Sequence, residues 1–218
     1  MIAQPTGSQA FDELLEGGYE RGIITAIYGP AGSGKSNLTL LALTAVQKRA
    51  IFMDTEGSFS VDRLHQLVPE VEKLLERVIV IKAHSLEEQT KAILKLPRMV
   101  QDDIELVIVD GIANQYRAAI ARGVRDVNNH LSQQMNALFQ TASEHDIPVL
   151  ITSQVYADLD GEGVKVVGGD IVKYSSKCMI ELRYDNGKRS AVLTKHRFVA
   201  PGRSRKFVID NVGIYEEK

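Results

Sequence analysis

The chain has 218 residues, of which 44% are hydrophobic and 25% are charged, and its formal net charge is −2. These values are typical of one packed domain, and they exclude a protein that is basic over its whole surface. No apolar stretch is long enough to span a bilayer, no signal peptide is recognisable, and Cys178 is the single cysteine, so we expect a cytoplasmic protein.

Apolar runs alternate with helical patterns along most of the chain, as in successive βαβ units of a parallel sheet. The expected strands are residues 22–28, 50–54, 78–82, 106–110 and 149–152. The expected helices are residues 36–47, 62–75, a helix that opens with the capping box at 85–88, and 127–144. Pro97 should disturb the helix that opens at Ser85. The helix over 127–144 carries an apolar stripe that we expect in the core, namely Leu131, Met135, Leu138, Phe139 and Ala142.

The C-terminal third changes to extended segments without helices. The expected strands are 178–184, 190–195 and 206–209, and Asn186-Gly187 is a strong signal for a hairpin turn. The fold class is therefore α/β, with a mainly parallel sheet flanked by helices and antiparallel C-terminal strands. Two long glycine-bearing loops, 111–126 and 155–170, should be functional or mobile.

A phosphate-binding loop follows the first strand. Its glycines let backbone N–H groups turn toward a phosphate, and the following helix adds free donors at its N-terminus. Lys35 is expected to reach the β- and γ-phosphates, and the Ser36 hydroxyl to bind Mg²⁺. The candidate nucleotide-binding residues are Gly29, Pro30, Ala31, Gly32, Ser33, Gly34, Lys35, Ser36 and Asn37.

Two carboxylates follow apolar strands. Asp110 ends the strand 106–110, as in a Walker B segment, and would hold the Mg²⁺ shell. Glu56 follows the strand 50–54, at the sheet edge where ligands of open α/β folds bind, and is the candidate base that orients an attacking water. Each residue taken alone could instead be an ordinary turn residue, but the nearby P-loop favours the catalytic interpretation.

These segments, together with residues 151–155, resemble the RecA family of recombinases over almost the whole chain. The resemblance implies a RecA-like P-loop NTPase core that uses ATP and Mg²⁺. It also implies that Gln154 senses the γ-phosphate and couples it to a DNA-binding loop over 155–169. The loop 111–126 resembles the second DNA-facing loop of the family, through Arg117, Arg122 and Arg125.

The nearest branch is that of short archaeal relatives of the RadA recombinase, because Thr6-Gly7 leads into residues 11–15 directly before the core. We expect residues 1–218 to form a single ATPase core domain without an N-terminal helical DNA-binding domain, which argues against ordinary filament assembly. The resemblance implies an accessory role in DNA recombination and repair, with weak Mg-dependent ATP hydrolysis and little strand exchange alone. It also implies a homo-oligomer and two protein partners, RadA and the Hjc Holliday-junction resolvase.

A basic motif, Lys195-His196-Arg197, lies on an expected extended segment. Alternation along a strand would point Lys195 and Arg197 to one face and His196 to the other. Three interpretations remain open: charges that reach a neighbour's nucleotide, a DNA-backbone patch, or a solvated strand. For the whole chain, a full strand-exchange recombinase and a KaiC-like signalling ATPase stay open as alternatives.

Overall fold

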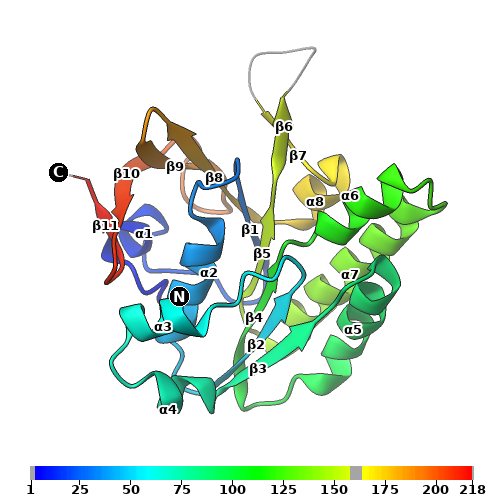
Figure 1. The fold of residues 1–218 in the computed structure, drawn as a ribbon, viewed down its shortest axis with the longest axis horizontal. Helices are drawn as coiled ribbons and strands as arrows, with labels where there is room; N and C mark the ends of the chain where they lie inside the picture. Colours follow the sequence, from blue (N-terminus) through cyan, green and yellow to red (C-terminus); the bar gives the residue numbers. More distant parts are fainter. Residues whose placement is uncertain (1–2, 158–163, 218) are drawn as a thin grey trace.

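A nine-stranded sheet forms the centre of the protein in a computed structural model that describes residues 3–157 and 164–217 (Figure 1). The strand order is β11-β10-β9-β8-β1-β5-β4-β2-β3. β1, β5, β4, β2 and β3 are parallel, which confirms the expected α/β class. The strands are β1 Ile24–Tyr28, β2 Arg49–Asp54, β3 Val78–Lys82, β4 Ile104–Asp110, β5 Val149–Ser153, β8 Cys178–Asp185, β9 Lys188–Lys195, β10 Ser204–Ile209 and β11 Ile214–Glu216.

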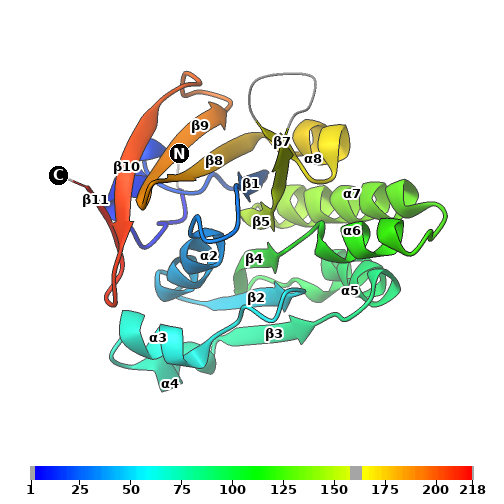
Figure 2. The ribbon, with the colours of Figure 1, turned by 45° about the horizontal axis from the view of Figure 1, so that its top comes forward.

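Helices cover both faces of the parallel part of the sheet (Figure 2). The first four contribute to one apolar cluster, and α5, α7 and α8 contribute to the other, against which α6 also packs. The helices of the first face are α1 Gln9–Leu14, α2 Lys35–Thr44, α3 Val61–Leu67 and α4 Val71–Leu75. Those of the second face are α5 Leu86–Met99, α6 Asn114–Ala121, α7 Val127–His145 and α8 Gly169–Ser175.

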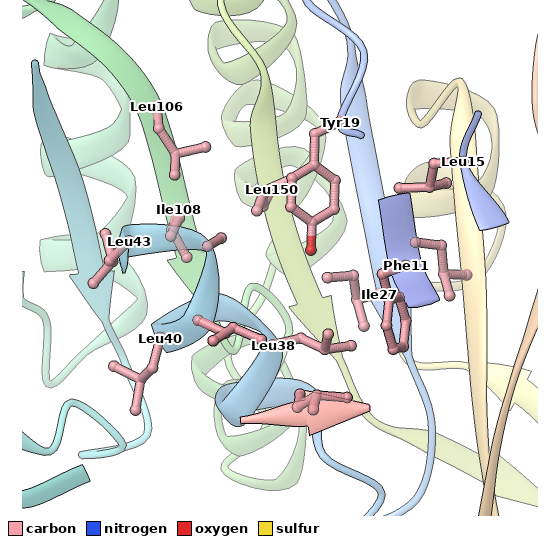
Figure 3. Close-up of a cluster of buried hydrophobic side chains, with 14 of the residues drawn as sticks. Phe11, Leu15, Tyr19, Ile27, Leu38, Leu40, Leu43, Leu106, Ile108 and Leu150 are labelled. Carbon is pink, nitrogen blue, oxygen red and sulfur yellow. The ribbon is translucent and has the colours of Figure 1, made fainter. Parts of the chain in front are cut away.

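The two clusters arise from alternation along the strands. In β4, Ile108 belongs to the cluster under α2, whereas Val107 and Val109 belong to the cluster under α5 and α7. Figure 3 shows the first cluster, in which Leu38 and Leu43 of α2 lie over the sheet. Because both faces are covered, the parallel strands are apolar throughout rather than alternating with polar residues.

The C-terminal strands extend the sheet on one side. β8 pairs in parallel with β1 but antiparallel with β9, so the change of direction occurs at β8. Asn186 and Gly187 have φ values of 49° and 79°, which is the left-handed backbone that a tight hairpin turn requires. The expected turn and antiparallel strands are confirmed, and the short edge strand β11 was not anticipated.

The expected helix over 62–75 is wrong in one respect, because it is two helices. α3 ends at Leu67, and Val68 has extended backbone with φ −138° and ψ 136°. Val68 precedes Pro69, whose ring clashes with the residue before it in a helical conformation. The chain therefore breaks at the proline and starts α4 at Val71.

Two expectations for the second helical layer are also wrong. α5 continues through Pro97 to Met99, since a proline in the last turn removes only one helical hydrogen bond near an end that frays in any case. Phe139 is 43% exposed rather than buried, whereas Leu131, Met135, Leu138 and Ala142 are in the core. Phe139 lies at the margin of the stripe, one residue from Leu138, and the layer does not cover it.

Both long loops contain regular structure in their described residues. The segment 111–126 contains α6, and the segment 155–170 contains an antiparallel pair, β6 Val155–Ala157 and β7 Val164–Val166, and the start of α8. Residues 158–163 of the expected DNA-binding loop lie outside the described residues. Among the described residues, no helix is both long enough and apolar enough to cross a membrane.

Candidate functional site

The candidate site lies at the carboxyl ends of the central parallel strands. The P-loop joins β1 to α2, Asp54 and Asp110 end β2 and β4, and Gln154 follows β5. These strands are neighbours in the order β1-β5-β4-β2, so their ends meet at one edge of the sheet. This is the edge at which open α/β folds bind ligands.

The P-loop is enclosed on one side by the C-terminal strands. A Cβ atom on Gly29 would lie 2.3 Å from the backbone oxygen of Leu182 in β8. Gly34 has a φ of 108°, and a Cβ atom there would lie 2.6 Å from Ile209 Cδ1 in β10. Glycine is therefore required at position 29 by the close backbone contact and at position 34 by the left-handed backbone.

Lys35 and Ser33 bring polar groups into the centre of the loop. Lys35 Nζ donates to the carbonyl oxygens of Gly29 and Pro30, at 3.0 Å and 2.8 Å. Burial lowers the pKa of Lys35, while the nearby carboxylates of Glu56 and Asp110 oppose that shift. The buried Ser33 hydroxyl has no hydrogen-bond partner among the described residues. A buried cation and an unpaired hydroxyl in a glycine-rich loop before a helix N-terminus fit a phosphate group.

The oxygen atoms of Ser36 and Asp110 could bind Mg²⁺ only if a nucleotide supplied further oxygen ligands to the same ion. Asp110 accepts the Thr152 hydroxyl at 2.6 Å and also the Ser58 hydroxyl, and Ser36 is the second residue of α2. In the part of the chain that the structure describes, no group of three or more histidine, cysteine or acidic side chains could hold a metal. Mg²⁺ commonly takes one or two protein oxygens and completes its shell with phosphate and water, which this pair allows.

Asp54 organises the loop that carries Glu56, and sequence reasoning did not assign it a role. Its buried carboxylate accepts four consecutive backbone N–H groups, from Glu56 at 3.2 Å, Gly57 at 2.7 Å, Ser58 at 3.0 Å and Phe59 at 3.2 Å. An aspartate before a glycine-containing turn commonly bonds to the backbone ahead of it, and this signal could have indicated it. The path of the Glu56 loop is thus set by one side chain.

Glu56 faces the segment that follows β4. A Cβ atom on Gly111 would lie 2.6 Å from Glu56 Cγ, so only glycine fits beside this glutamate. Although Glu56 is exposed overall, partial burial of its carboxyl group raises its pKa, and Asp110 adds to the increase. Lys35, Gln154 and Arg117 oppose it. A carboxylate with a raised pKa accepts a proton more readily than an ordinary glutamate.

Gln154 connects Glu56 to Arg117. Gln154 Nε2 donates to Glu56 Oε1 over a long 3.4 Å, and Arg117 Nη1 donates to Gln154 Oε1 at 3.0 Å. Arg117 of α6 therefore lies in the candidate site, apart from Arg122 and Arg125, which are exposed at the end of α6 and beyond it. The Gln154 side chain thus donates to a carboxylate through its amide nitrogen and accepts from a guanidinium group through its amide oxygen.

Comparison with known proteins agrees with this arrangement. A sequence model of the Rad51 family matches residues 1–217. The chain is 35% identical to the DNA repair and recombination protein RadB of Methanobrevibacter smithii, over 96% of this chain and 94% of that protein. It is 37% identical to the protein of the same name from Methanococcoides burtonii, over 93% of each chain. The chain belongs to the Rad51 family.

The fold of this Rad51-family chain also matches a solved relative. The crystal structure of the RadB recombinase superposes with a TM-score of 0.87, at 34% identity and over 100% of both chains. The similarity thus extends over the C-terminal strands as well as over the parallel half of the sheet. These matches confirm the resemblance to RadB proteins that the motifs indicate.

The basic motif does not form one surface, contrary to the expectation from alternation. β9 ends at Lys195, and His196 Nδ1 accepts the N–H groups of Phe198 and Val199, each at 3.1 Å, so the chain turns instead of extending. Arg197 pairs with the buried carboxylate of Glu20. Lys195 and Arg197 consequently line two different clefts.

Lys195 lies in a basic cleft between β9 and the β6–β7 pair, which Tyr28 and Tyr156 also line. Its Nζ atom donates to the carbonyl oxygen of Lys173 at 2.7 Å. Burial lowers the pKa of Lys195, and the nearby positive charges of Lys177 and Lys173 lower it further. We call this region the lysine cleft, defined by Lys165, Lys173 and Lys195, which line it together with Asp170. Arg197 and His196 line the other cleft, together with the acidic residues Glu16, Glu20 and Asp146.

Proposed function

We propose that this chain binds Mg-ATP at the P-loop and acts as an accessory ATPase in DNA repair and homologous recombination. The observation that carries the proposal is the P-loop between β1 and α2, in which buried Lys35 has its ammonium group on the carbonyl oxygens of Gly29 and Pro30 and Ser33 has a buried, unpaired hydroxyl. Asp110, Glu56 and Gln154 face the same sheet edge. The names of the RadB relatives support the role in DNA repair and recombination.

The phosphates of ATP would take the place of the P-loop carbonyls as partners of Lys35. Residues 29–37 would surround them, with Ser36 and Asp110 holding Mg²⁺, which neutralises charge on the β- and γ-phosphate oxygens when it is bound. Glu56 would orient water and accept its proton, because its pKa is raised and its loop is fixed by Asp54. Gln154 would exchange its contact with Glu56 for a γ-phosphate oxygen, since an amide can donate to either group.

Hydrolysis by the isolated chain should be weak. Charge that develops on the transferred phosphoryl group needs several cations around it, and loss of such a group costs several orders of magnitude in rate. Lys35 and Arg117 are the cations that act on Glu56, whereas Lys195 and Arg197 line other clefts. A second subunit could supply Arg197 to this site, which favours a homo-oligomer as the active form.

DNA is the proposed ligand of the lysine cleft. The positive charges of Lys173 and Lys177 act on Lys195, and exposed Tyr156 lines the same cleft as a surface on which a nucleobase could stack. Exposed Arg122 and Arg125, at the end of α6 and beyond it, are proposed as further DNA contacts. RadA recombinase and the Hjc junction resolvase are proposed partners by family resemblance, with co-purification as the direct measurement.

One titration tests the nucleotide and DNA parts together. We expect Mg-ATP binding, and DNA affinity that falls steeply with salt, because each neutralised duplex phosphate contributes about 0.9 to the slope of log affinity against log salt. Absence of ATP binding would contradict the whole proposal. ATP binding without any salt-sensitive DNA binding would favour a signalling ATPase of the KaiC type. Filaments with strongly DNA-stimulated hydrolysis would favour a full recombinase.

A further inference from the structure

Arg189, in the hairpin formed by β8 and β9, contacts the P-loop and belongs to none of the nucleotide-binding motifs. Arg189 Nε and Nη2 both donate to the carbonyl oxygen of Gly32, at 3.3 Å and 3.2 Å. Tyr184 and Arg189 are directly opposite each other in the hairpin. The guanidinium carbon lies 4.4 Å from the centroid of the Tyr184 ring, in a cation–π contact.

The peptide group between Gly32 and Ser33 is thereby held at both ends. Arg189 binds its carbonyl from outside the loop, and its N–H, which belongs to Ser33, donates to the Pro30 carbonyl at 3.3 Å. Gly32 adopts a φ of 74°, which glycine accommodates without strain. With both ends held, this peptide cannot rotate freely about its neighbouring bonds.

The orientation of this peptide matters for phosphate binding. A P-loop attracts phosphate because its N–H groups point inward, and a carbonyl that turned inward would repel the same oxygen atoms. The carbonyls of Gly29 and Pro30 already accept from Lys35 inside the loop. The Gly32 carbonyl is bound instead by Arg189, whose planar guanidinium group is stacked on Tyr184.

We propose that Arg189, stacked on Tyr184, is a positioning residue that keeps the Gly32 carbonyl turned away from the phosphates and so prepares the P-loop for nucleotide. This inference rests on the proposed binding of ATP at that loop. Arg189 acts through the backbone of the P-loop and not through contact with the adenine base of the nucleotide. Its contribution should therefore be the same for any ligand that offers the same chain of phosphates.

The test compares Arg189→Ala with Arg183→Ala by calorimetric titration of ATP and of inorganic tripolyphosphate. Arg183 is the matched control, because it belongs to the same hairpin and pairs with Glu181 instead of the P-loop. We expect Arg189→Ala to lower the affinity for both ligands by about tenfold and Arg183→Ala to leave both affinities unchanged. Arg189→Lys should recover only part of the loss, since an ammonium group cannot provide the same two-pronged, stacked contact.

A second pair of variants separates positioning from folding. Tyr184→Ala removes the ring under Arg189 and should lower the affinity for both ligands. Tyr184→Phe keeps the ring and should have the affinities of the wild-type chain. Thermal unfolding without nucleotide should be nearly equal in Tyr184→Ala and Tyr184→Phe. Equal affinities in Arg189→Ala and Arg183→Ala, full recovery by Arg189→Lys, or a loss confined to ATP would overturn the inference. Failure of the unchanged chain to bind ATP would instead overturn the proposed function.

Discussion

The two halves of the sheet approach the proposed nucleotide site in different ways. The parallel half presents strand ends, so that Asp54, Asp110 and Gln154 reach the site as the last residues of strands or the first residues after them. The antiparallel half presents its side, through the Leu182 carbonyl, Arg189 and Ile209. The first half supplies groups that can take part in chemistry, and the second supplies the wall against which the P-loop is shaped. Changes in the first should therefore alter catalysis, and changes in the second should alter affinity.

The sharpest test of the parallel half is Glu56→Gln. An amide can hold water but cannot accept its proton, so we expect single-turnover hydrolysis to fall by roughly 100-fold or more while Mg-ATP binding is retained. Because the pKa of Glu56 is raised above its ordinary value, hydrolysis by the unchanged chain should be lost as pH falls through a value higher than that of a free glutamate. A rate unaffected by the substitution would remove Glu56 from the catalytic role.

Lys35→Ala should produce the next largest effect, on binding rather than on rate. Among the described residues, its ammonium group hydrogen-bonds to P-loop carbonyls and not to another element, so the fold should survive while ATP affinity falls by about 100-fold. Lys48→Ala is the control, because Lys48 is an exposed lysine that bonds to the Asp102 carbonyl away from the site. Equal ATP affinities in the two variants, measured at equilibrium, would contradict the assignment of Lys35.

Asp54→Ala should affect both the stability of the fold and the rate of hydrolysis, since it leaves four backbone N–H groups without their acceptor. We expect a loss of about 2 kcal/mol in the free energy of unfolding, together with slower hydrolysis as Glu56 loses its fixed path. Urea unfolding measures the first quantity and single-turnover hydrolysis the second. Asp62→Ala, an exposed change at the start of α3, is the control. A stable variant with normal hydrolysis would show that the loop holds its shape by other means.

The smallest expected effect separates the two clefts of the antiparallel half. Lys195→Ala should reduce the salt slope of DNA binding by about 0.9, as expected for one lost phosphate contact. Arg197→Ala should leave that slope unchanged and instead weaken ATP-dependent self-association, because Arg197 lies in the other cleft, beside Glu20. Sedimentation and salt titration of both variants provide the two readouts. Identical behaviour of the two variants would mean that the clefts act as one surface.

Sequence patterns predict best where a local signal and a tertiary need coincide. The strand Val78–Lys82 has the expected bounds, and the Asn186-Gly187 turn joins β8 to β9 as expected. Local signals were misleading where the neighbours decide the outcome. Phe139 has the right spacing for the core, yet it lies where the helical layer ends. Helical spacing gives the direction of a side chain but not the extent of what covers it.

In the candidate site, too, local sequence patterns indicate some residues, whereas others depend on tertiary contacts that no local pattern shows. Lys35, Asp110 and Glu56 could be proposed as site residues because strand, loop and acid follow each other in fixed patterns, and they remain predictions. Arg189 could not, since its contact with Gly32 joins residues 157 positions apart and depends on the pairing of β8 with β1. Lys195 and Arg197 were placed on one face because the turn at His196 has no glycine or proline to indicate it.

The contacts of Gly29 with Leu182 and of Gly34 with Ile209 have a consequence for biosynthesis. The ribosome makes the P-loop early, but the strands that enclose it are made about 150 residues later. A nascent chain can therefore expose the complete motif while one wall of its site is still missing. Nucleotide added during translation should be retained only after β10 has left the exit tunnel. A truncated chain that ends before β8 would carry every nucleotide-binding motif and still lack the enclosed loop.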